Sequence, residues 1–179
     1  MDRTTRVVNR LWGNLDAEGQ LHAHPRFADE LEAQCNGKLA LHAPQVSKWT
    51  FGQQLEHLFR GSHFVIDRLQ ESMGRDHATD PLGPLGYSFL VAGFIPRGMF
   101  PTIPQLVPGA GTMAEIEPLR QSLRERLAAI DWSLVQIKAS PGKSRHPRMQ
   151  WMTSSQWMLF ADVHHRHHLR IIRDIVRKA

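Results

Sequence analysis

Four histidines stand within five residues near the C-terminus, where positions 164–168 read His-His-Arg-His-His. The segment around them has the apolar periodicity of a helix, and on a wheel of roughly 100° per residue Ile171 and Ile175 lie within roughly 60° of His164. His164 is therefore expected to face the interior, with His168 one turn away and roughly 40° to one side. Two imidazoles a turn apart on an inward face can point at one transition-metal ion. The spacing thus predicts a metal site inside a helical protein.

A third ligand is expected from another helix, because helical bundles build metal sites from side chains on facing helices. His57 is the best candidate, since it lies about 130° from the centre of the apolar stripe of its own helix and shares that side with Gln54. Such a side faces a cleft more readily than a dry core. We therefore expect His57 to join His164 and His168 at one metal. An alternative ligand set uses one of the two remaining histidines of the run, His167 or His165.

Apolar residues recur at helical spacing in five stretches, and no segment has a convincing strand pattern. The expected helices cover about residues 4–15, 25–41, 51–73, 113–131 and the segment from 154 to near the C-terminus. Thr50 and Thr153 are expected to cap the two helices that carry the candidate ligands, because a glutamine follows each threonine three residues later, as in a capping box. The sequence therefore predicts an all-α protein.

The stretch between about residues 74 and 111 is dense in proline and glycine. No long regular element tolerates this density. The stretch is also rich in leucine and phenylalanine, so we expect it to pack on the helices as a long ordered loop. Loops of this length in compact domains are usually functional or disordered, and the apolar content favours function. We interpret the loop as a lid or an oligomer contact.

The composition is that of an ordinary globular protein, with 41% hydrophobic and 22% charged residues in 179. It predicts a single domain, 1–179, with a hydrophobic core. No apolar run approaches the ~18 residues that cross a bilayer, and no signal-peptide pattern begins the chain, so we expect a cytoplasmic protein without a membrane partner. The net charge of +5 is a mild excess, and acidic residues interrupt the basic last helix, so nucleic-acid binding is not expected. The single cysteine, Cys35, is not expected to act as a nucleophile.

His146 precedes a proline at the mouth of the last helix, and we expect its side chain to contact a bound small molecule. The other histidines are expected on exposed segments or helix flanks: His22, His24, His42, His63 and His77. Three tryptophans are expected to serve packing: Trp49, Trp151 and Trp157.

Two motifs near the C-terminus resemble those of a known family. Residues 146–157 read His-Pro-Arg-Met-Gln-Trp-Met-Thr-Ser-Ser-Gln-Trp, close to the pattern His-Pro-x-x-Gly-x-Met-Thr-x-x-x-Trp. Residues 164–171 follow the pattern His-x-x-His-His-Leu-Arg-Gln except at the last position, and residues 95–98, Ile-Pro-Arg-Gly, are similar too. From about Phe27 to Val176 the chain resembles the DinB superfamily, in particular a bacterial branch with these motifs.

This resemblance implies a four-helix bundle of up-down-down-up order, with an extra N-terminal helix and the long Pro- and Gly-rich loop between helices 2 and 3. It also implies one divalent metal, bound by a histidine from the second helix and a His-x3-His pair from the fourth. By position these residues are His57, His164 and His168. The chain departs from the family pattern at Gln150, where glycine is usual, and at Ile171, where glutamine is common.

Three neutral imidazoles leave a divalent ion with its full +2 charge and with open positions, as in a catalytic site. Zinc, nickel, iron and manganese all accept nitrogen ligands, so the spacing does not choose among them. Characterised members of the superfamily include thiol-dependent S-transferases and isomerases. The resemblance therefore implies a metal-dependent transferase that activates a low-molecular-weight thiol for attack on a small electrophile.

Two other functions stay open at this point. One is a metal-hydroxide hydrolase, for which Glu56 or Glu71 would serve as general base. Glu56 lies about 100° from His57 around the helix, which favours a salt-bridge role at the flank instead. The other is a non-enzymatic module in which the metal stabilises a binding or oligomer surface. For the enzyme we expect a small-molecule substrate and, because members of the family often dimerise, a homodimer.

Overall fold

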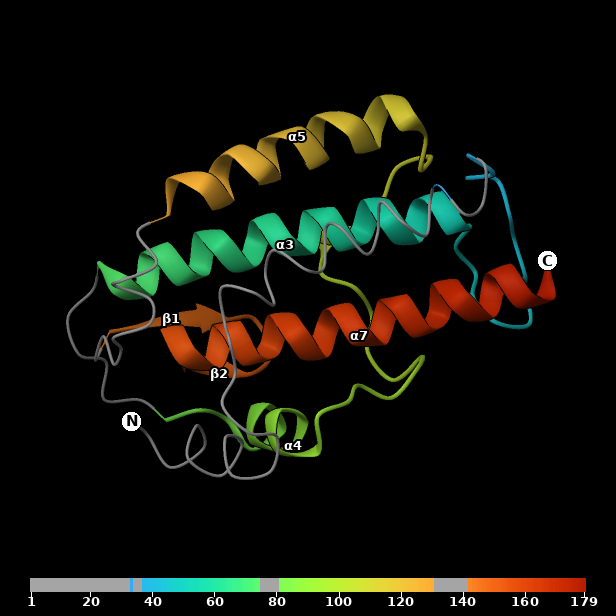
Figure 1. Cartoon of the computed structure of the whole chain (residues 1–179). Helices are drawn as coiled ribbons and strands as arrows, with labels where there is room; N and C mark the ends of the chain where they lie inside the picture. Colours follow the sequence, from blue (N-terminus) through green and yellow to red (C-terminus); the bar gives the residue numbers. More distant parts are fainter. Residues whose placement is uncertain (1–32, 34–36, 75–80, 131–141) are drawn as a thin grey trace. The chain divides into compact units, whose positions relative to one another are not determined.

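The computed structural model describes residues 33, 37–74, 81–130 and 142–179 (Figure 1). This part of the chain is mostly helical, in agreement with the sequence, and the up-down-down-up order stays a prediction. Its elements are α3 (Phe51–Met73), α4 (Pro84–Ala92), the 3-10 turn η1 (Pro104–Leu106), α5 (Met113–Ala129), β1 (Lys143–His146), β2 (Gln150–Thr153) and α7 (Ser154–Lys178). The expected helix 4–15, most of 25–41 and Cys35 lie outside the described residues, as do His22, His24 and His77.

Both long helices begin with the capping boxes that the sequence predicts. At the start of α3, Thr50 Oγ1 accepts the Gln53 backbone N–H at 3.2 Å, and Gln53 Oε1 accepts the Thr50 N–H at 3.1 Å. The same exchange joins Thr153 and Gln156 at the start of α7, at 3.3 and 3.0 Å. These reciprocal bonds satisfy N–H groups that a helix terminus leaves open, which fixes where each helix begins.

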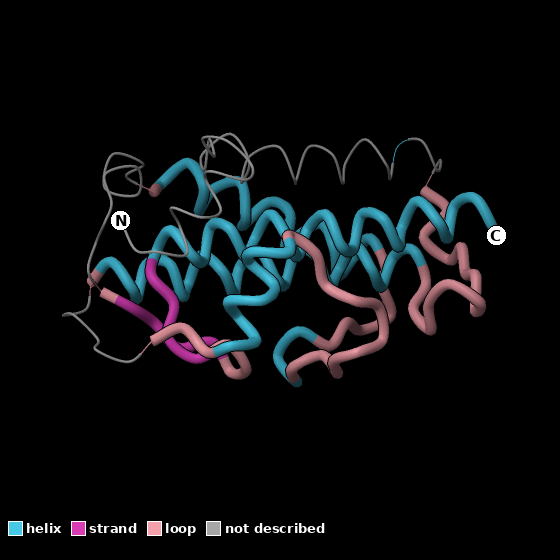
Figure 2. Tube along the Cα trace, turned by 90° about the horizontal axis from the view of Figure 1, so that it is seen from below, coloured by secondary structure: helices cyan, strands magenta, loops and turns pink. Residues whose placement is uncertain are grey.

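The sequence predicts no strands, and this expectation is wrong. Residues 143–146 and 150–153 form an antiparallel hairpin, in which Ser144 pairs with Met152 and His146 with Gln150 (Figure 2). Its first strand reads Lys-Ser-Arg-His, which lacks apolar alternation because the buried positions hold Ser144 and His146. The expected helix 25–41 is also wrong at its end, since residues 37–41 form turns.

The loop expected at 74–111 contains a regular element after all. Helix α4 occupies Pro84–Ala92, with Pro84 in its first turn and Gly93 in the left-handed conformation at its end. Proline is suited to the start of a helix and glycine to its end. The two residue types therefore mark the limits of this helix instead of excluding it.

The chain divides into two compact units, and α3 and α7 each run from one into the other. Unit 1 comprises residues 1–21, 64–96 and 130–164, and its buried apolar residues include Ile66, Leu69, Leu90, Met152 and Trp157. Unit 2 comprises residues 22–63, 97–129 and 165–179, and its buried apolar residues include Leu55, Phe59, Leu123, Ile172 and Ile175. The expectation of a single domain stays a prediction.

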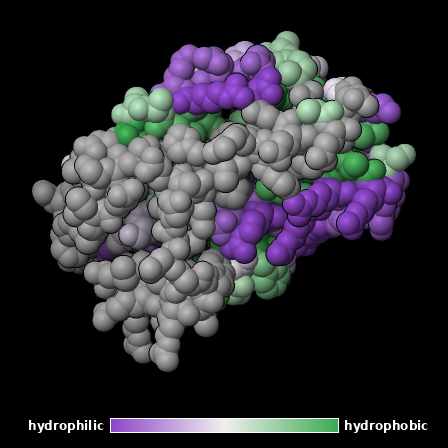
Figure 3. All heavy atoms as spheres, in the orientation of Figure 1, coloured by the Kyte–Doolittle hydropathy of each residue, from purple (hydrophilic) through white to green (hydrophobic). Residues whose placement is uncertain are grey.

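Polar side chains dominate the exposed face of α5. Figure 3 shows hydrophilic side chains gathered over α5, where Glu117, Gln121 and Arg124 are exposed. The basic residues Arg170 and Arg173 of α7 are exposed as well. None of the helices in the described ranges has an apolar stretch long enough to cross a membrane.

Candidate metal centre

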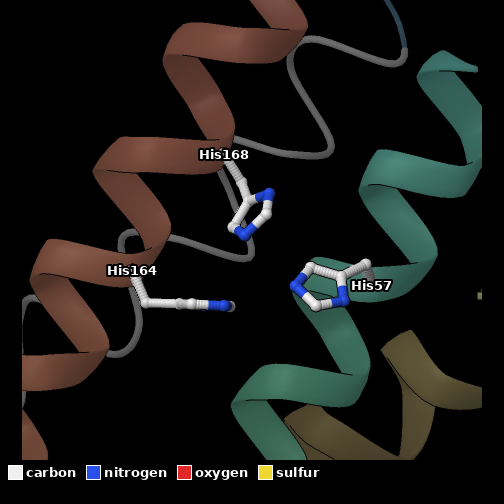
Figure 4. A group of neighbouring side chains, drawn as sticks. All are labelled: His57, His164 and His168. Carbon is white, nitrogen blue, oxygen red and sulfur yellow. The ribbon is translucent and has the colours of Figure 1, made fainter. Parts of the chain in front are cut away.

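Three buried histidines lie together in the structure: His57 from α3, and His164 and His168 from α7. One ring nitrogen of each lies within 4.8 Å of the corresponding nitrogens of the other two. Figure 4 shows the three rings pointing toward a common space. These are the residues that the sequence predicts as metal ligands, and the structure brings them together.

The two helices supply this geometry in a simple way. His164 and His168 are one turn apart on α7, so the continuous helix holds both rings on one face. The ring centroids of His57 and His168 are 4.4 Å apart. The sequence places His57 away from the apolar stripe of its helix, which predicts that it faces a cleft. In the structure His57 is only 3% exposed, so this side of α3 is covered.

A backbone carbonyl orients the ring of His57. Its Nδ1 lies 2.6 Å from the carbonyl oxygen of Leu106 in η1. A carbonyl oxygen only accepts hydrogen bonds, so the proton of the neutral ring resides on Nδ1 and the lone pair on Nε2. Burial lowers the pKa of His57 below its ordinary value, although the Leu106 hydrogen bond opposes this. The neutral form, which is the metal-binding form, is therefore favoured.

A side-chain amide orients the ring of His168 in the same way. His168 Nδ1 donates to Gln54 Oε1 at 2.8 Å, and Gln54 Nε2 in turn donates to Ser47 Oγ at 2.9 Å. His168 therefore also carries its proton on Nδ1 and its lone pair on Nε2. Metal-bound histidines usually donate their second ring N–H to a carboxylate, a carbonyl or water. His57 and His168 both follow this pattern.

The donor set and the spacing fit a divalent transition metal. Nitrogen ligands at about 2.1 Å from one ion are at most about 4.2 Å apart, so small side-chain rotations bring the three nitrogens into range. Three imidazoles suit zinc, nickel and iron, and they accept manganese as well. In the described part of the chain, no other group of histidine, cysteine or acidic residues has this arrangement.

The alternative ligands His165 and His167 do not belong to this group. The buried His165 instead makes a 2.7 Å hydrogen bond through Nε2 to Ser62 Oγ, and this hydroxyl donates to the Leu58 carbonyl oxygen at 3.0 Å. His167 is half-buried and packs edge-on against His168, with 4.8 Å between ring centroids. The structure thus separates the run of four histidines into two that face the site and two that do not join it.

His146 lies on β1 in unit 1, where the sequence predicts a ligand contact that nothing in the structure tests. Its Nδ1 accepts the backbone N–H groups of Arg148 and Met149, both at 3.1 Å. Its ring packs on Trp157 and Phe160, with centroids 5.5 and 5.0 Å away. Burial, aided by the charge of Arg148, lowers the pKa of His146 to about 4.

The remaining described histidines agree with the expectation of exposed or flanking positions. His42 is exposed. His63 is half-buried on the flank of α3, where Nε2 donates to the Leu119 carbonyl oxygen at 2.9 Å and Nδ1 accepts from Arg126 at 3.1 Å. Both of its nitrogens therefore help to join α3 to α5.

Glu56 is the salt-bridge partner that the sequence predicts, but it is not at an exposed flank. Its side chain is fully buried and pairs with Arg60 at 2.7 Å. Its second oxygen, Oε2, accepts the N–H groups of Gly109 and Gly111 at 2.9 and 3.2 Å. Glu71, the other suggested base, pairs with Arg68 in unit 1.

The sequence interpretation missed the roles of Gln54 and Leu106. The sequence does contain a signal for Gln54, because the helical wheel places it on the same side of the helix as His57. For Leu106 there is none, because a backbone carbonyl has no signature in the side-chain pattern.

A family model described as the DinB superfamily matches residues 1–172, which is nearly the whole chain. The same comparisons find no match among curated proteins and none among solved structures.

Proposed function

The chain belongs to the DinB superfamily, and from this membership we propose that it is a metal-dependent enzyme. In this proposal His57, His164 and His168 hold one divalent ion, zinc, nickel, iron or manganese. The enzyme uses it to activate a low-molecular-weight thiol for attack on a small electrophile. The observation that carries the proposal is the approach of three buried imidazole nitrogens to within 4.8 Å of one another.

The chain's own residues prepare a site of this kind. The three imidazoles are neutral ligands, so they leave the charge of a divalent ion uncompensated. The Leu106 carbonyl and the Gln54 amide keep the lone pairs of His57 and His168 on Nε2. A bound divalent ion supplies Lewis acidity, which lowers the pKa of a thiol or water that reaches it.

The hydrogen bonds that Glu56 already accepts favour a thiol over water as the nucleophile. Its carboxylate already accepts hydrogen bonds from Arg60, Gly109 and Gly111, so it is poorly placed to take a proton from water. A free thiol, with a pKa of about 8.5, is far more acidic than water. The thiol therefore needs a much smaller shift and no protein base to ionise near neutral pH. This comparison makes hydrolysis the second candidate.

The proposed reaction is a displacement at carbon. The thiolate sulfur donates an electron pair to the electrophilic carbon and forms the C–S bond. The bond to the leaving group breaks, and the leaving group departs with its electron pair. The thiol proton passes to solvent.

The test is a conjugation assay with the purified protein loaded with each of the four metals. A chromogenic aryl halide serves as the electrophile, with a panel of low-molecular-weight thiols. We expect conjugation above the background rate for at least one pair of metal and thiol. His57→Ala should abolish this activity while the far-ultraviolet circular dichroism stays unchanged. Arg170→Ala, which truncates an exposed side chain of α7, is the control.

The same assay separates the alternatives. Thiol-independent turnover of ester or amide substrates, lost in His57→Ala, would replace the transferase proposal with hydrolysis. Metal binding without turnover of either substrate class would instead favour a metal-stabilised binding or oligomer module.

We further propose a homodimer. Exposed apolar side chains in the described segments support a partner surface, and they include Met99, Val107 and Val176 of unit 2. Light scattering coupled to size exclusion should give twice the mass of the 20.5 kDa chain. The mass of a single chain would contradict this.

A further inference from the structure

We propose that Gln54 and Glu56 are positioning residues of the metal centre. Gln54 acts on His168 directly, and Glu56 acts on His57 through the segment 104–111. This inference rests on the proposed binding of a metal by the three histidines and adds the residues that fix the orientation of two of them.

Gln54 is held on both sides of its amide. The side chain is 2% exposed, and Nε2 donates to Ser47 Oγ, which also accepts the Trp49 backbone N–H at 3.0 Å. With its nitrogen engaged by Ser47, the amide presents Oε1 to His168 Nδ1. A rotation of the amide by 180° would place a donor against the donor of His168. Gln54 thus selects both the ring orientation and the tautomer that puts the lone pair on Nε2.

Glu56 fixes the segment that orients His57. Its Oε2 binds the N–H groups of Gly109 and Gly111, which follow Leu106 by three and five residues. The neighbouring Gln53 adds a third tie, since its Nε2 donates to the Gly109 carbonyl oxygen at 2.8 Å. A buried carboxylate is costly unless hydrogen bonds or an opposite charge compensate it. Arg60 pairs with Oε1 of Glu56, and the two glycine N–H groups that bind Oε2 are the contacts that hold the segment. The Leu106 carbonyl is thereby kept 2.6 Å from His57 Nδ1.

Two glycines allow this close packing of the segment on α3. A methyl group on Gly111 would overlap the backbone nitrogen of Gln53, and one on Gly52 would overlap the carbonyl oxygen of Gly111. Backbone therefore lies directly on backbone at the first turn of α3. The short distance brings the segment within reach of Glu56. Glycine at both positions is thus a requirement of the arrangement around His57.

Both ligands consequently depend on residues that do not touch the ion. Outer-shell partners of metal-bound histidines are typically worth about 10–100-fold in metal affinity. The same magnitude is expected for Gln54, which contacts a ligand directly. For Glu56, which acts through the backbone, we expect a smaller loss of metal affinity, about 10-fold.

The experiment is a cobalt(II) titration of the whole chain, followed by the visible d–d absorption of the bound ion, which reports on coordination geometry. Gln54→Leu removes the acceptor, and Gln54→Glu keeps one. Glu56→Gln weakens the hold on Gly109 and Gly111. The matched control is Arg60→Met, which removes the ion pair of Glu56 and leaves the contacts with the two glycines in place.

We expect Gln54→Leu to weaken cobalt binding by about 10–100-fold and to change the d–d spectrum. Gln54→Glu should bind at least as tightly as the natural protein, because a carboxylate is a stronger acceptor. Glu56→Gln should lose about 10-fold, and Arg60→Met should bind normally. If Gln54→Leu does not fold, Ser47→Ala tests the same link more mildly, since it releases the far side of the amide.

The outcomes distinguish the two proposals. If the natural protein binds no cobalt, zinc or nickel, the proposed function fails. If it binds cobalt and both Gln54→Leu and Glu56→Gln match it in affinity and spectrum, the positioning role is overturned and the metal site stands. Equal losses in Glu56→Gln and Arg60→Met would assign the effect of Glu56 to its ion pair and overturn its role through the segment.

Discussion

Two regions of the molecule use buried histidines in opposite ways. At the candidate metal centre, Nδ1 of His57 and Nδ1 of His168 each lie against a carbonyl oxygen, so these nitrogens donate. In the β1–β2 hairpin, Nδ1 of His146 accepts two backbone N–H groups, from Arg148 and Met149. The surroundings of Nδ1 therefore place the proton on opposite nitrogens in the two regions.

The difference explains why burial alone does not identify a ligand. His146 is as buried as His164 and His168, yet its Nδ1 is committed to holding the turn between two strands. Its ring also rests on Trp157 and Phe160. A buried histidine is a metal candidate when a carbonyl takes its Nδ1 proton and a second helix brings another imidazole to the same place.

The largest expected effect is the loss of metal affinity when a ligand is removed, compared with removal of His146. His57→Ala should weaken metal binding by more than about 100-fold, beyond the range of outer-shell changes, because it removes a ligand itself. His146→Asn should leave metal affinity unchanged, since His146 is not a ligand in this account. Isothermal titration with zinc measures both affinities. Equal losses in the two variants would show that the two regions are not distinct.

The second effect concerns stability in acid. The pKa of His146 is about 4 in the folded protein, against an ordinary 6.5. Below pH 6.5 the unfolded chain binds a proton that the folded protein excludes. His146 therefore stabilises the fold fully above pH 6.5, and about 3 kcal/mol of stability is lost as the pH falls to about 4.

Urea denaturation between pH 7 and pH 4 measures this loss. His146→Asn is the sharpest variant, because an asparagine oxygen can accept the same backbone N–H groups and does not titrate. We expect a shallower pH dependence in this variant. An unchanged slope would assign the acid sensitivity to other groups.

The third effect contrasts two glycines that have the same positive φ. Gly111 and Gly98 both have a φ of 70°, but only at Gly111 would an added methyl group meet other atoms. Gly98→Ala should therefore cost about 1 kcal/mol for the left-handed conformation alone. Gly111→Ala should cost about 2–4 kcal/mol, because backbone must also move apart. Thermal unfolding of the two variants tests this, and equal costs would contradict the close packing on α3.

The smallest effect lies in the hairpin. Gln150 begins β2 with a φ of 67°, a conformation that glycine adopts more easily. Gln150→Gly should raise the free energy of unfolding by about 0.5 kcal/mol, since relief of strain slightly exceeds the added entropy of the unfolded chain. Gln121→Gly, at an exposed position of α5, is the control and should lower it by about 1 kcal/mol. A loss in both variants would show that Gln150 is not strained.

Much of the structure near the metal centre could be predicted from the sequence because it depends on local rules. The capping boxes at Thr50 and Thr153 are signals within four residues, and the apolar period beyond each cap defines the rest of the helix. The same period places His164 and His168 on the inward face. The two helices and the inward positions of His164 and His168 follow from such short-range patterns, whereas the choice of His57 rests on the expectation of facing helices and on the family resemblance.

Other parts of the structure could not be predicted because no side-chain pattern marks them. The hairpin strand Lys-Ser-Arg-His has no apolar alternation, although its partner 150–153 follows after only three residues. The departure at Gln150 is visible in the sequence, but the left-handed backbone that explains the usual glycine is not. The Leu106 carbonyl reaches His57 over 49 positions, and a backbone group leaves no trace in side-chain patterns.

The most direct measurement is a crystal structure of the metal-loaded protein with anomalous diffraction recorded at the absorption edge of the bound element. We expect one anomalous peak about 2.0–2.2 Å from a ring nitrogen of each of His57, His164 and His168. We also expect the coordinating nitrogens of His57 and His168 to be Nε2. A peak elsewhere, or the three rings pointing apart with no ion between them, would contradict the account.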